Sequence, residues 1–416
     1  MADNKDKKVL NVPALRFPEF TGEWKRIRVS DLLDFYSTNS LSWEQLEYES
    51  NEPYNLHYGL IHVGLPTLVD LTKDKLPNIK DGNVPKKYEL CKEGDIAFAD
   101  ASEDTNEVAK VVEFYNLDGK KVVCGLHTIH GRNNKGQTSK GFLGYCFSST
   151  VFHNQIRRIA QGTKIYSINT RNFSEVFVGL PSKSEQHKIA TLLRLIDERI
   201  STQNKIIEDL KKLKSAIVEM ILCKQGGVLL KLGDVGSFIR GLTYSSEDIA
   251  EDINATTVIR ANNLNYGNNV SKKDVVYVNK KPTEIQILRK GDIVICMANG
   301  SSSLVGKNSY YSFDDRQSTI GAFCGIYRSS QPLVKWLMQS QRYRRLVYQS
   351  LQGGNGAIAN LNGDDILNMT FYVVEDKKSV SILSALVLIE NSIAVNEKLQ
   401  ELYSMQKEYL LQHLFI

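Results

Sequence analysis

The second half of this chain repeats the pattern of its first half. The segment 92–96, which contains Asp95, recurs 197 residues later as the segment 289–293, which contains Asp292. Further along, an offset of 193 residues pairs Ile189 with Ile382. A period of about 195 residues is too long for the unit of a solenoid. We therefore expect that the 416 residues contain one module, a domain followed by a helix, twice, with internal pseudo-two-fold symmetry.

The predicted fold class is α+β, with two β-rich domains that are each followed by a long helix. In the β-rich domains, short apolar runs are separated by Gly, Pro, Asn and Asp, which is typical of strands and turns. Such runs occur at 95–99, 121–129 and 141–147, and shorter helices are predicted at 151–160 and 333–351. The predicted segments are a lead-in at 1–22, a domain at 23–180, a helix at 181–225, a domain at 226–376 and a helix at 377–416.

The two long helices are predicted from apolar residues spaced alternately four and three apart. This spacing places them on one narrow stripe of a helix, which needs a second helix to bury it. Pro181 precedes the first helix, Ser182 or Ser184 can cap it, and Glu185 lies in the first turn, where the helix dipole favours a carboxylate. The predicted seam consists of Ile189, Leu193, Ile196, Ile200, Gln203, Ile207, Leu210, Ile382, Leu386, Ile389, Ile393, Asn396, Tyr403 and Leu410.

Matched polar residues within the two seams indicate how the helices run. A parallel pair in register would place Lys214 against Lys407 in a desolvated seam, which is unfavourable. In an antiparallel pair the two lysines lie far apart, while Gln203 and Asn396 lie near the middle and can approach each other. We therefore expect an antiparallel coiled coil with the β-rich domains at its opposite ends.

Composition indicates a soluble intracellular protein without a membrane segment. The net charge of +5 permits an anionic partner without requiring one. The six cysteines lie far apart with no Cys-x-x-Cys spacing, which is typical of reduced thiols in the cytoplasm. The polar start at 1–8 has no apolar core, and no apolar run approaches the length of about 20 residues that a membrane span needs. We expect a cytoplasmic location.

Motifs for catalysis are absent from the sequence. None of the nine prolines is adjacent to another, which excludes the Asn-Pro-Pro-aromatic or Asp-Pro-Pro-aromatic turn of an adenine-N6 methyltransferase. The segment 300–307 imitates a phosphate loop, but Asn308 stands where such a loop has Ser or Thr. His127 and His130 have the spacing of metal ligands, but no Cys or carboxylate cluster accompanies them in sequence. We expect a structural pair of histidines, no metal site and no enzyme activity on this chain.

Two β-rich domains, each followed by a heptad helix, resemble the specificity subunit of a type I restriction–modification system. In that family the domains are target recognition domains and the helices are spacers. The second spacer departs from the family pattern, because Val374-Glu375-Asp376 stands where the first has Pro181 and Glu185-Gln186. The segments that carry the resemblance are 15–18 with 22–24, 92–96 with 289–293, 181–186 leading into 189–200, and 353–356 before Asn362.

The resemblance implies a non-catalytic DNA-binding subunit that recognises a bipartite site in double-stranded DNA. It implies two methyltransferase subunits and ATP-dependent restriction–translocase subunits as partners, which carry S-adenosylmethionine, ATP and Mg²⁺. Asn and Gln can pair with adenine and Arg with guanine, while Lys and Arg contact phosphate. Alternatives are a duplicated coiled-coil DNA-binding regulator and a protein-binding scaffold. The candidate DNA contacts are Arg132, Asn133, Asn134, Lys135, Gln137, Lys140, Arg260, Asn262, Asn263, Asn265, Asn268, Lys272 and Lys273.

Overall fold

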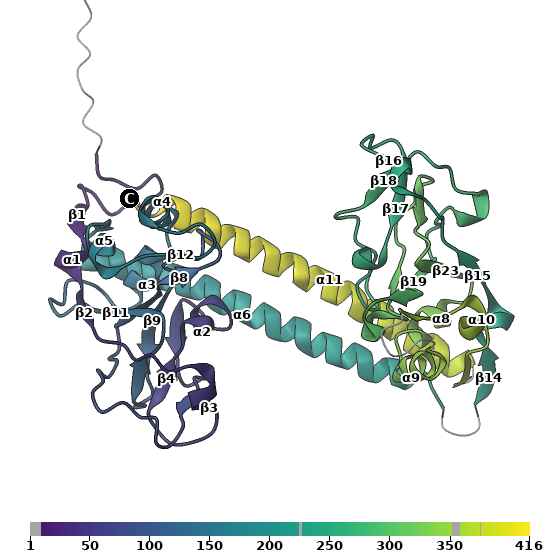
Figure 1. The fold of residues 1–416 in the computed structure, drawn as a ribbon, viewed down its shortest axis with the longest axis horizontal. Coiled ribbons are helices and arrows are strands. Elements are labelled where there is room, and N and C mark those ends of the chain that lie inside the picture. The colour runs from purple at the N-terminus through teal and green to yellow at the C-terminus, as the bar shows by residue number, and fades with distance from the viewer. Residues whose placement is uncertain (1–9, 224–226, 352–357, 375) are drawn as a thin grey trace, which may run out of the picture. The chain divides into compact units, whose positions relative to one another are not determined.

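The computed structural model describes residues 10–223, 227–351, 358–374 and 376–416, with the side chains of 376–378 left out. These residues form two compact units (Figure 1). Unit 1 contains the chain up to Asn204 and the segment from Lys398 to Ile416, and unit 2 contains Lys205–Glu397. Both long helices therefore contribute one part to each unit. The motif at 353–356, Glu375 and the polar start at 1–8 lie outside the described residues.

Unit 1 is built on two sheets and two short strand pairs. The five-stranded sheet has the order β2 (Asp34–Tyr36), β11 (Thr128–Arg132), β7 (Ile96–Ala99), β9 (Val111–Asn116) and β5 (Leu68–Asp70). The four-stranded sheet has the order β10 (Val122–Cys124), β4 (Tyr54–Leu56), β6 (Asn78–Ile79) and β3 (Leu46–Glu47). The strand pairs are β1 (Lys25–Arg28) with β13 (Phe177–Leu180), and β8 (Ala101–Ser102) with β12 (Tyr166–Ser167).

The helices of unit 1 pack on an aromatic core around Phe98, which is fully buried. Phe98 contacts the rings of Phe147 and Phe173 at centroid distances of 4.9 and 4.7 Å. The helices are α1 (Val29–Leu32), 3₁₀ helix η1 (Trp43–Gln45), α2 (Tyr58–His62), α3 (Phe142–Phe147), α4 (Thr150–Ile159), α5 (Thr170–Ser174), the first part of α6 (Lys183–Glu219) and the last part of α11 (Asp376–His413).

Two of the local expectations for unit 1 have different outcomes. The helix expected at 151–160 is confirmed by α4, which begins after the N-cap Ser149. The strand expected at 141–147 is wrong, because this segment forms helix α3. All six residues of α3 are buried, and a short apolar run does not distinguish a buried strand from a buried helix.

Unit 2 also contains two sheets and two short strand pairs, and each of its sheets has four strands. One four-stranded sheet has the order β15 (Gly236–Arg240), β23 (Cys324–Ser329), β19 (Ile293–Cys296) and β21 (Asn308–Tyr310). The other has the order β16 (Ile249–Ala250), β18 (Val276–Val278), β17 (Thr256–Ile259) and β22 (Ser318–Ile320). The strand pairs are β14 (Val228–Lys231) with β25 (Thr370–Val373), and β20 (Ala298–Asn299) with β24 (Ala359–Asn360).

The helices of unit 2 include one break that the sequence pattern did not predict. The helix expected at 333–351 is two helices, because the chain leaves the helix at Met338 and Ser340 caps a new one. The helices are the last part of α6, α7 (Leu232–Val235), α8 (Pro332–Leu337), α9 (Gln341–Ser350), α10 (Gly363–Leu367), the first part of α11 (Asp376–His413) and the 3₁₀ helices η2 (Ser246–Asp248), η3 (Ala261–Asn263), η4 (Glu284–Gln286) and η5 (Ser302–Leu304).

The long helices make an ion pair with each other within each unit. Ser182 caps α6 and accepts a hydrogen bond from the backbone of Glu185, as expected. In unit 1, Lys407 of α11 pairs with Asp197 of α6 at 2.7 Å. In unit 2, Lys214 of α6 pairs with Glu390 of α11 at 3.5 Å. The predicted seam residues are all buried or half-buried.

One described helical segment, Ser379–His413, is long and apolar enough to cross a membrane by length and composition. The expectation that no apolar run approaches that length was therefore too strict, because it overlooked an apolar segment interrupted by Ser and Asn. One such helix does not by itself indicate a membrane protein, since a helix that buries an apolar stripe against a partner passes the same test.

A buried ion pair connects two adjacent strands of the central sheet in each unit. In unit 1, the guanidinium of Arg132 at the end of β11 donates two hydrogen bonds to Asp95, which precedes β7. In unit 2, Arg328 of β23 donates two hydrogen bonds to Asp292, which precedes β19. Both carboxylates also accept a hydrogen bond from the backbone three residues earlier. These bonds hold the turn before the strand against the neighbouring strand.

We predict that Asp292→Ala lowers the free energy of unfolding by about 3–5 kcal/mol, because Arg328 loses its charge partner in a largely buried position. Urea unfolding followed by circular dichroism measures the effect. Glu247→Ala, at an exposed position, is the matched control and should change stability little. A loss below about 1 kcal/mol for Asp292→Ala would contradict a structural role of the pair.

Candidate nucleic-acid interface

The candidate residues of unit 1 lie in the loop that follows β11. Asn134, Lys135, Gln137 and Lys140 are exposed, and Asn133 is half-buried. The loop is held in place from both sides. Asn134 donates hydrogen bonds to Asp34 and Tyr36, and Lys140 pairs with Glu93. The backbone of Ser139 donates to the side chain of Gln186 in the first turn of α6.

Arg132, the first of these candidates, lies in the interior. Its side chain donates to Asp95, to the carboxylate of Glu89 and to the carbonyl oxygen of Leu90. The hydrogen bond to Asp95, above all, raises the pKa of Arg132. Burial would raise the pKa of Asp95, but hydrogen bonds from His130 and Arg132 hold it below its ordinary value. The side chain of Arg132 therefore stabilises the fold and is not placed to reach DNA.

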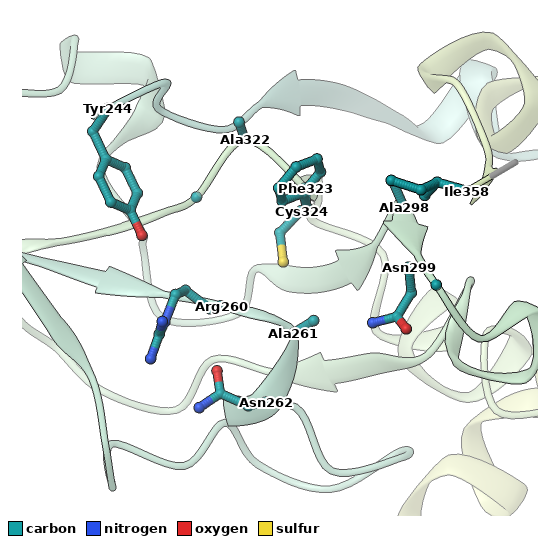
Figure 2. A pocket seen from close by; sticks show the side chains of 12 residues that line it. Tyr244, Arg260, Ala261, Asn262, Ala298, Asn299, Ala322, Phe323, Cys324 and Ile358 are labelled. Carbon is teal, nitrogen blue, oxygen red and sulfur yellow. The ribbon is translucent and has the colours of Figure 1, made fainter. Parts of the chain in front are cut away.

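In unit 2, Arg260 and Asn262 lie on the wall of a cleft of about 630 Å³. Figure 2 shows their polar ends, with those of Tyr244 and Asn299, around the hollow. The Nε atom of Arg260 is buried and has no hydrogen-bond partner in the part of the chain that the structure describes. The ring of Phe323 also lines the cleft and is 64% exposed. Guanidinium, amide and aromatic groups together suit the edges of bases.

The other candidates of unit 2 differ in their exposure. Asn263 is buried, accepts a hydrogen bond from the backbone of Arg260 and donates to the carbonyl of Lys273. It therefore supports the turn and is not placed to contact DNA. Lys272 is half-buried and pairs with Asp315 at 2.6 Å. The remaining candidates are exposed, and these are Asn265, Asn268 and Lys273.

The candidate loops of the two units lie at opposite ends of corresponding strands. His130 of β11 pairs with Ala97 of β7, and Ile326 of β23 pairs with Val294 of β19, so β11 and β23 occupy the same place in the two sheets. The loop at 133–140 follows the end of β11. The cleft of unit 2 includes Phe323, directly before β23 begins. Sequence composition alone did not reveal this difference.

The place in unit 1 that corresponds to the cleft holds an aromatic cluster that the sequence analysis missed. His127 directly precedes β11, as Phe323 precedes β23. Its ring contacts Tyr58 at 5.3 Å, and Tyr58 in turn contacts His57 at 4.7 Å. His57 packs on Trp43 at 4.4 Å, and Trp43 is 45% exposed. Four rings from three segments that are distant in sequence meet here, so no local sequence signal could have identified the cluster.

Glu113 lies beneath the end of the loop at 133–140. It is buried and accepts hydrogen bonds from the backbone of Gly144 and Gly141. Burial raises the pKa of Glu113 to about 7, and the hydrogen bonds from the two glycines offset this only in part. The carboxyl group therefore titrates near neutral pH at the point where the loop enters helix α3.

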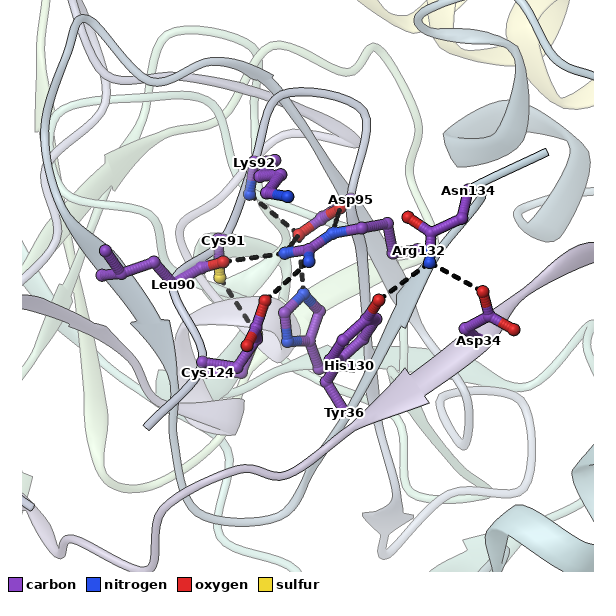
Figure 3. Close-up of polar contacts among 11 residues, drawn as sticks. Asp34, Tyr36, Leu90, Cys91, Lys92, Asp95, Cys124, His130, Arg132 and Asn134 are labelled. Carbon is purple, nitrogen blue, oxygen red and sulfur yellow. Dashed lines mark hydrogen bonds and ion pairs between the residues drawn. The ribbon is translucent and has the colours of Figure 1, made fainter. Parts of the chain in front are cut away.

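His130 lies beside two cysteines that are distant in sequence, a group that the spacing of His127 and His130 did not indicate. Cys91, Cys124 and His130 are all buried, and one ligand atom from each lies within 4.8 Å of the others. Their side chains appear together in Figure 3. The Cys91 and Cys124 sulfur atoms are 3.5 Å apart, and His130 Nε2 lies 2.8 Å from Asp95 Oδ2. These residues are distant in sequence, so their spacing gave no signal.

Comparisons with known proteins agree on one family. Residues 118–212 match the family model of the type I restriction modification DNA specificity domain. The EcoKI specificity subunit of Escherichia coli and the StySPI specificity subunit of Salmonella potsdam are each 28% identical over 164 residues. The chain is similar to type I specificity subunits. The resemblance expected from the sequence is therefore confirmed.

These matches differ in extent. The aligned region covers 38% of this chain and 35% of each of the two type I specificity subunits, so the chain spans about a third of the length of the curated relatives it matches. The fold is similar over 97% of the chain to a type I S subunit from M. genitalium, with a TM-score of 0.60 and 16% identity. A structure described for complex assembly of a type I system is similar over 93%, with a TM-score of 0.57 and 14% identity.

We predict that Glu113 makes stability fall as pH rises. The folded chain holds a proton on Glu113 up to a pKa of about 7, whereas the unfolded chain releases it near the ordinary value of 4.5. The stability from this group is complete below pH 4.5 and is lost as pH rises through 7. Between pH 4.5 and pH 8 the loss should reach at most about 3 kcal/mol.

Urea unfolding of the wild type and Glu113→Gln across this pH range isolates the contribution of Glu113, because their difference cancels the other titrating groups. The wild type should lose stability relative to Glu113→Gln on going to high pH. Glu103→Gln, at an exposed position, is the matched control. A difference between wild type and Glu113→Gln that stays constant with pH would show that Glu113 titrates normally.

Proposed function

We propose that this chain is the non-catalytic DNA specificity subunit of a type I restriction–modification complex. The match of residues 118–212 to the DNA specificity domain carries the proposal. The proposed target recognition domains are 23–180 and 226–376, and the spacers are 181–225 and 377–416. Methyl transfer and ATP-dependent restriction belong to partner subunits, which supply S-adenosylmethionine, ATP and Mg²⁺. The complex acts in the cytoplasm.

The reading surface of each domain is the end of the sheet that carries the cleft in unit 2. Arg260 and Asn262 supply donors and acceptors that distinguish guanine and adenine in the major groove. In unit 1 the corresponding surface carries Trp43, Tyr58 and His127. In unit 2 the exposed Lys273, whose carbonyl accepts a hydrogen bond from Asn263, adds a phosphate contact that does not depend on sequence. The two domains thus read two different half-sites.

The spacer helices form an antiparallel coiled coil that sets the distance between the half-sites. The two ion pairs support this direction, because Asp197 of α6 meets Lys407 late in α11, whereas Lys214 of α6 meets Glu390 earlier in α11. From the first ion pair to the second, the residue number rises along α6 and falls along α11, as it does in an antiparallel pair of helices. Helix α6 has 37 residues and extends about 55 Å at 1.5 Å per residue. A rigid element of that length can separate two reading surfaces by several base pairs of unread DNA.

Each unit also offers an apolar helical face for one methyltransferase subunit. The coiled-coil seam buries one stripe of α11, and large apolar residues remain exposed on other faces. Exposed apolar surface of this kind is typical of binding sites for other proteins. These residues are Val380, Val387, Leu388 and Val395 in unit 2, and Leu399, Leu402, Met405 and Tyr409 in unit 1.

Co-expression of the full chain with a matching methyltransferase subunit, followed by genome-wide mapping of N6-methyladenine, tests the proposed function. We expect methylation at one bipartite motif that appears only when this chain is present. Methylation that is independent of the chain, or no motif together with binding of the chain to the methyltransferase, would favour a protein-binding scaffold instead.

We predict that Asn262→Ala relaxes recognition at one base position of one half-site. Loss of a base-edge contact should reduce discrimination about 10–100-fold, since such a contact contributes about 1–3 kcal/mol. Motif mapping and binding to oligonucleotides that differ at single positions measure the change. Asn254→Ala, in an exposed turn outside the cleft, should leave the motif unchanged. If Asn262→Ala alters both half-sites or neither, the cleft of unit 2 does not read bases.

We predict that removing one heptad from both spacers shortens the unread gap and leaves the half-sites unchanged. Deletion of residues 201–207 together with 394–400 removes corresponding turns and keeps the seam in phase. Seven residues span about 10 Å of helix, which corresponds to about three base pairs. Mapping of methylated motifs in cells that carry the deletion measures the gap. An unchanged gap would contradict the role of the helices as spacers.

A further inference from the structure

One nitrogen of His130 is unused in the interior of unit 1. The side chain of His130 is fully buried, and its Nε2 atom faces the carboxylate of Asp95 at 2.8 Å. Its Nδ1 atom has no hydrogen-bond partner among the residues that the structure describes. Asp95 is an ionised carboxylate that also accepts from Arg132, so Nε2 donates to it, and in the neutral imidazole Nδ1 then carries a lone pair. A buried lone pair lowers the stability of the fold unless it accepts a hydrogen bond or coordinates a metal ion.

The two sulfur atoms near His130 are spaced as metal ligands. Cys91 Sγ and Cys124 Sγ lie 3.5 Å apart. Two thiolates on one tetrahedral Zn²⁺ ion are about 3.8 Å apart when each Zn–S bond is about 2.3 Å. A disulfide would require sulfur atoms at about 2.0 Å. The observed spacing is therefore close to that of a shared metal ion.

Unit 2 shows that this fold does not need polar side chains at these three places. The backbone of Cys91 donates to Val122, and that of Leu288 donates to Ser318 in the same way. By the pairings of the strands, Cys124 corresponds to Ile320 and His130 corresponds to Ile326. Leu288, Ile320 and Ile326 are buried together in one apolar cluster. Unit 1 replaces all three hydrocarbons by metal-ligating groups, while the Asp–Arg pair beside them is the same in both units.

We propose that Cys91, Cys124 and His130 bind a Zn²⁺ ion through the two sulfur atoms and Nδ1. Thiolate and imidazole are the ligands that Zn²⁺ prefers. Binding releases the thiol protons to solvent, and His130 coordinates as neutral imidazole. Asp95 holds the ring in the required tautomer, as carboxylates do behind histidine ligands of zinc. No fourth Cys, His, Asp or Glu joins the group within the described ranges, so a water molecule completes the coordination.

The ion would connect parts of unit 1 that belong to different sheets. Cys124 ends β10 of the four-stranded sheet, and His130 lies in β11 of the five-stranded sheet. Cys91 lies in the segment before β7. The turn between β10 and β11 carries His127 of the aromatic cluster. Zinc would therefore fix the base of this surface. This structural role does not depend on which DNA sequence the surface binds.

Metal analysis of the full chain tests the site without using activity. The protein is purified from zinc-supplemented medium under reducing conditions, and its zinc content is measured by mass spectrometry. We expect about one Zn²⁺ per chain. The apo-protein should also take up Co²⁺ with thiolate-to-cobalt charge-transfer absorption, and its melting temperature should rise when Zn²⁺ is added.

The variant Cys91→Leu/Cys124→Ile/His130→Ile introduces the residues of unit 2 and should bind less than a tenth as much zinc as the wild type while keeping its circular dichroism spectrum. The single variant Cys91→Ser serves as a second readout if the triple variant does not fold. Cys146→Ala and His127→Ala are matched controls outside the cluster and should retain zinc. A wild type without zinc, zinc retained by a folded triple variant or by Cys91→Ser, or a Cys91–Cys124 disulfide in place of the metal would each overturn the proposal.

Discussion

The buried carboxylate–guanidinium pair at the centre of each unit determines how the surrounding segments are placed. Asp95 and Asp292 each precede a central strand, and Arg132 and Arg328 lie on the neighbouring strand. Removing such charges from water costs several kcal/mol, which the pair offsets only because nearly every donor and acceptor is used. Arg328 also donates to the carbonyl oxygens of Ile285 and Ile287. The pair therefore fixes the register of the two strands and also holds the segment that precedes the central strand. In that segment Cys91 of unit 1 and Leu288 of unit 2 each donate a backbone hydrogen bond to a strand of the second sheet.

The same framework accepts two different interiors and two different surfaces. In unit 2 aliphatic side chains fill the space beside the ion pair, and the surface above it is a cleft with Arg260 and Asn262. In unit 1 thiols and an imidazole fill that space, and the surface carries aromatic rings. Hydrogen bonds of the backbone are matched at these places, since Gly125 donates to Leu56 as Gly321 donates to Ile259. The surface can thus differ between the units through side chains alone, because the backbone that supports them depends on the ion pair and not on what lies above it.

Periodic features of the sequence predicted the structure better than composition did. The start of α6 after Ser182 and the helix α4 follow from local patterns, because capping and heptad spacing act over a few residues. The segment 141–147 was predicted wrongly because its apolar run is equally suited to a buried helix. Among the candidate residues, Arg260 and Asn262 lie on the wall of a cleft, whereas Arg132 and Asn263 have the same polarity but face the interior. The aromatic cluster and the cysteine pair depend on contacts between distant segments, for which a single sequence contains no local signal.

The lysines in the helical seam help to define the register of the two helices, which the apolar stripe does not define by itself. Apolar side chains pack almost equally well after a shift of one heptad, so they do not define a unique register. Lys214 and Lys407 are each paired with a carboxylate on the other helix, and Lys407 also lies over the ring of Tyr145. A shift of seven residues would break both of these lysine–carboxylate contacts, although Asp197 also accepts a hydrogen bond from Tyr145 and Glu390 also pairs with Lys335. The two ion pairs therefore favour one register of the helices, which hydrocarbon packing alone would not define.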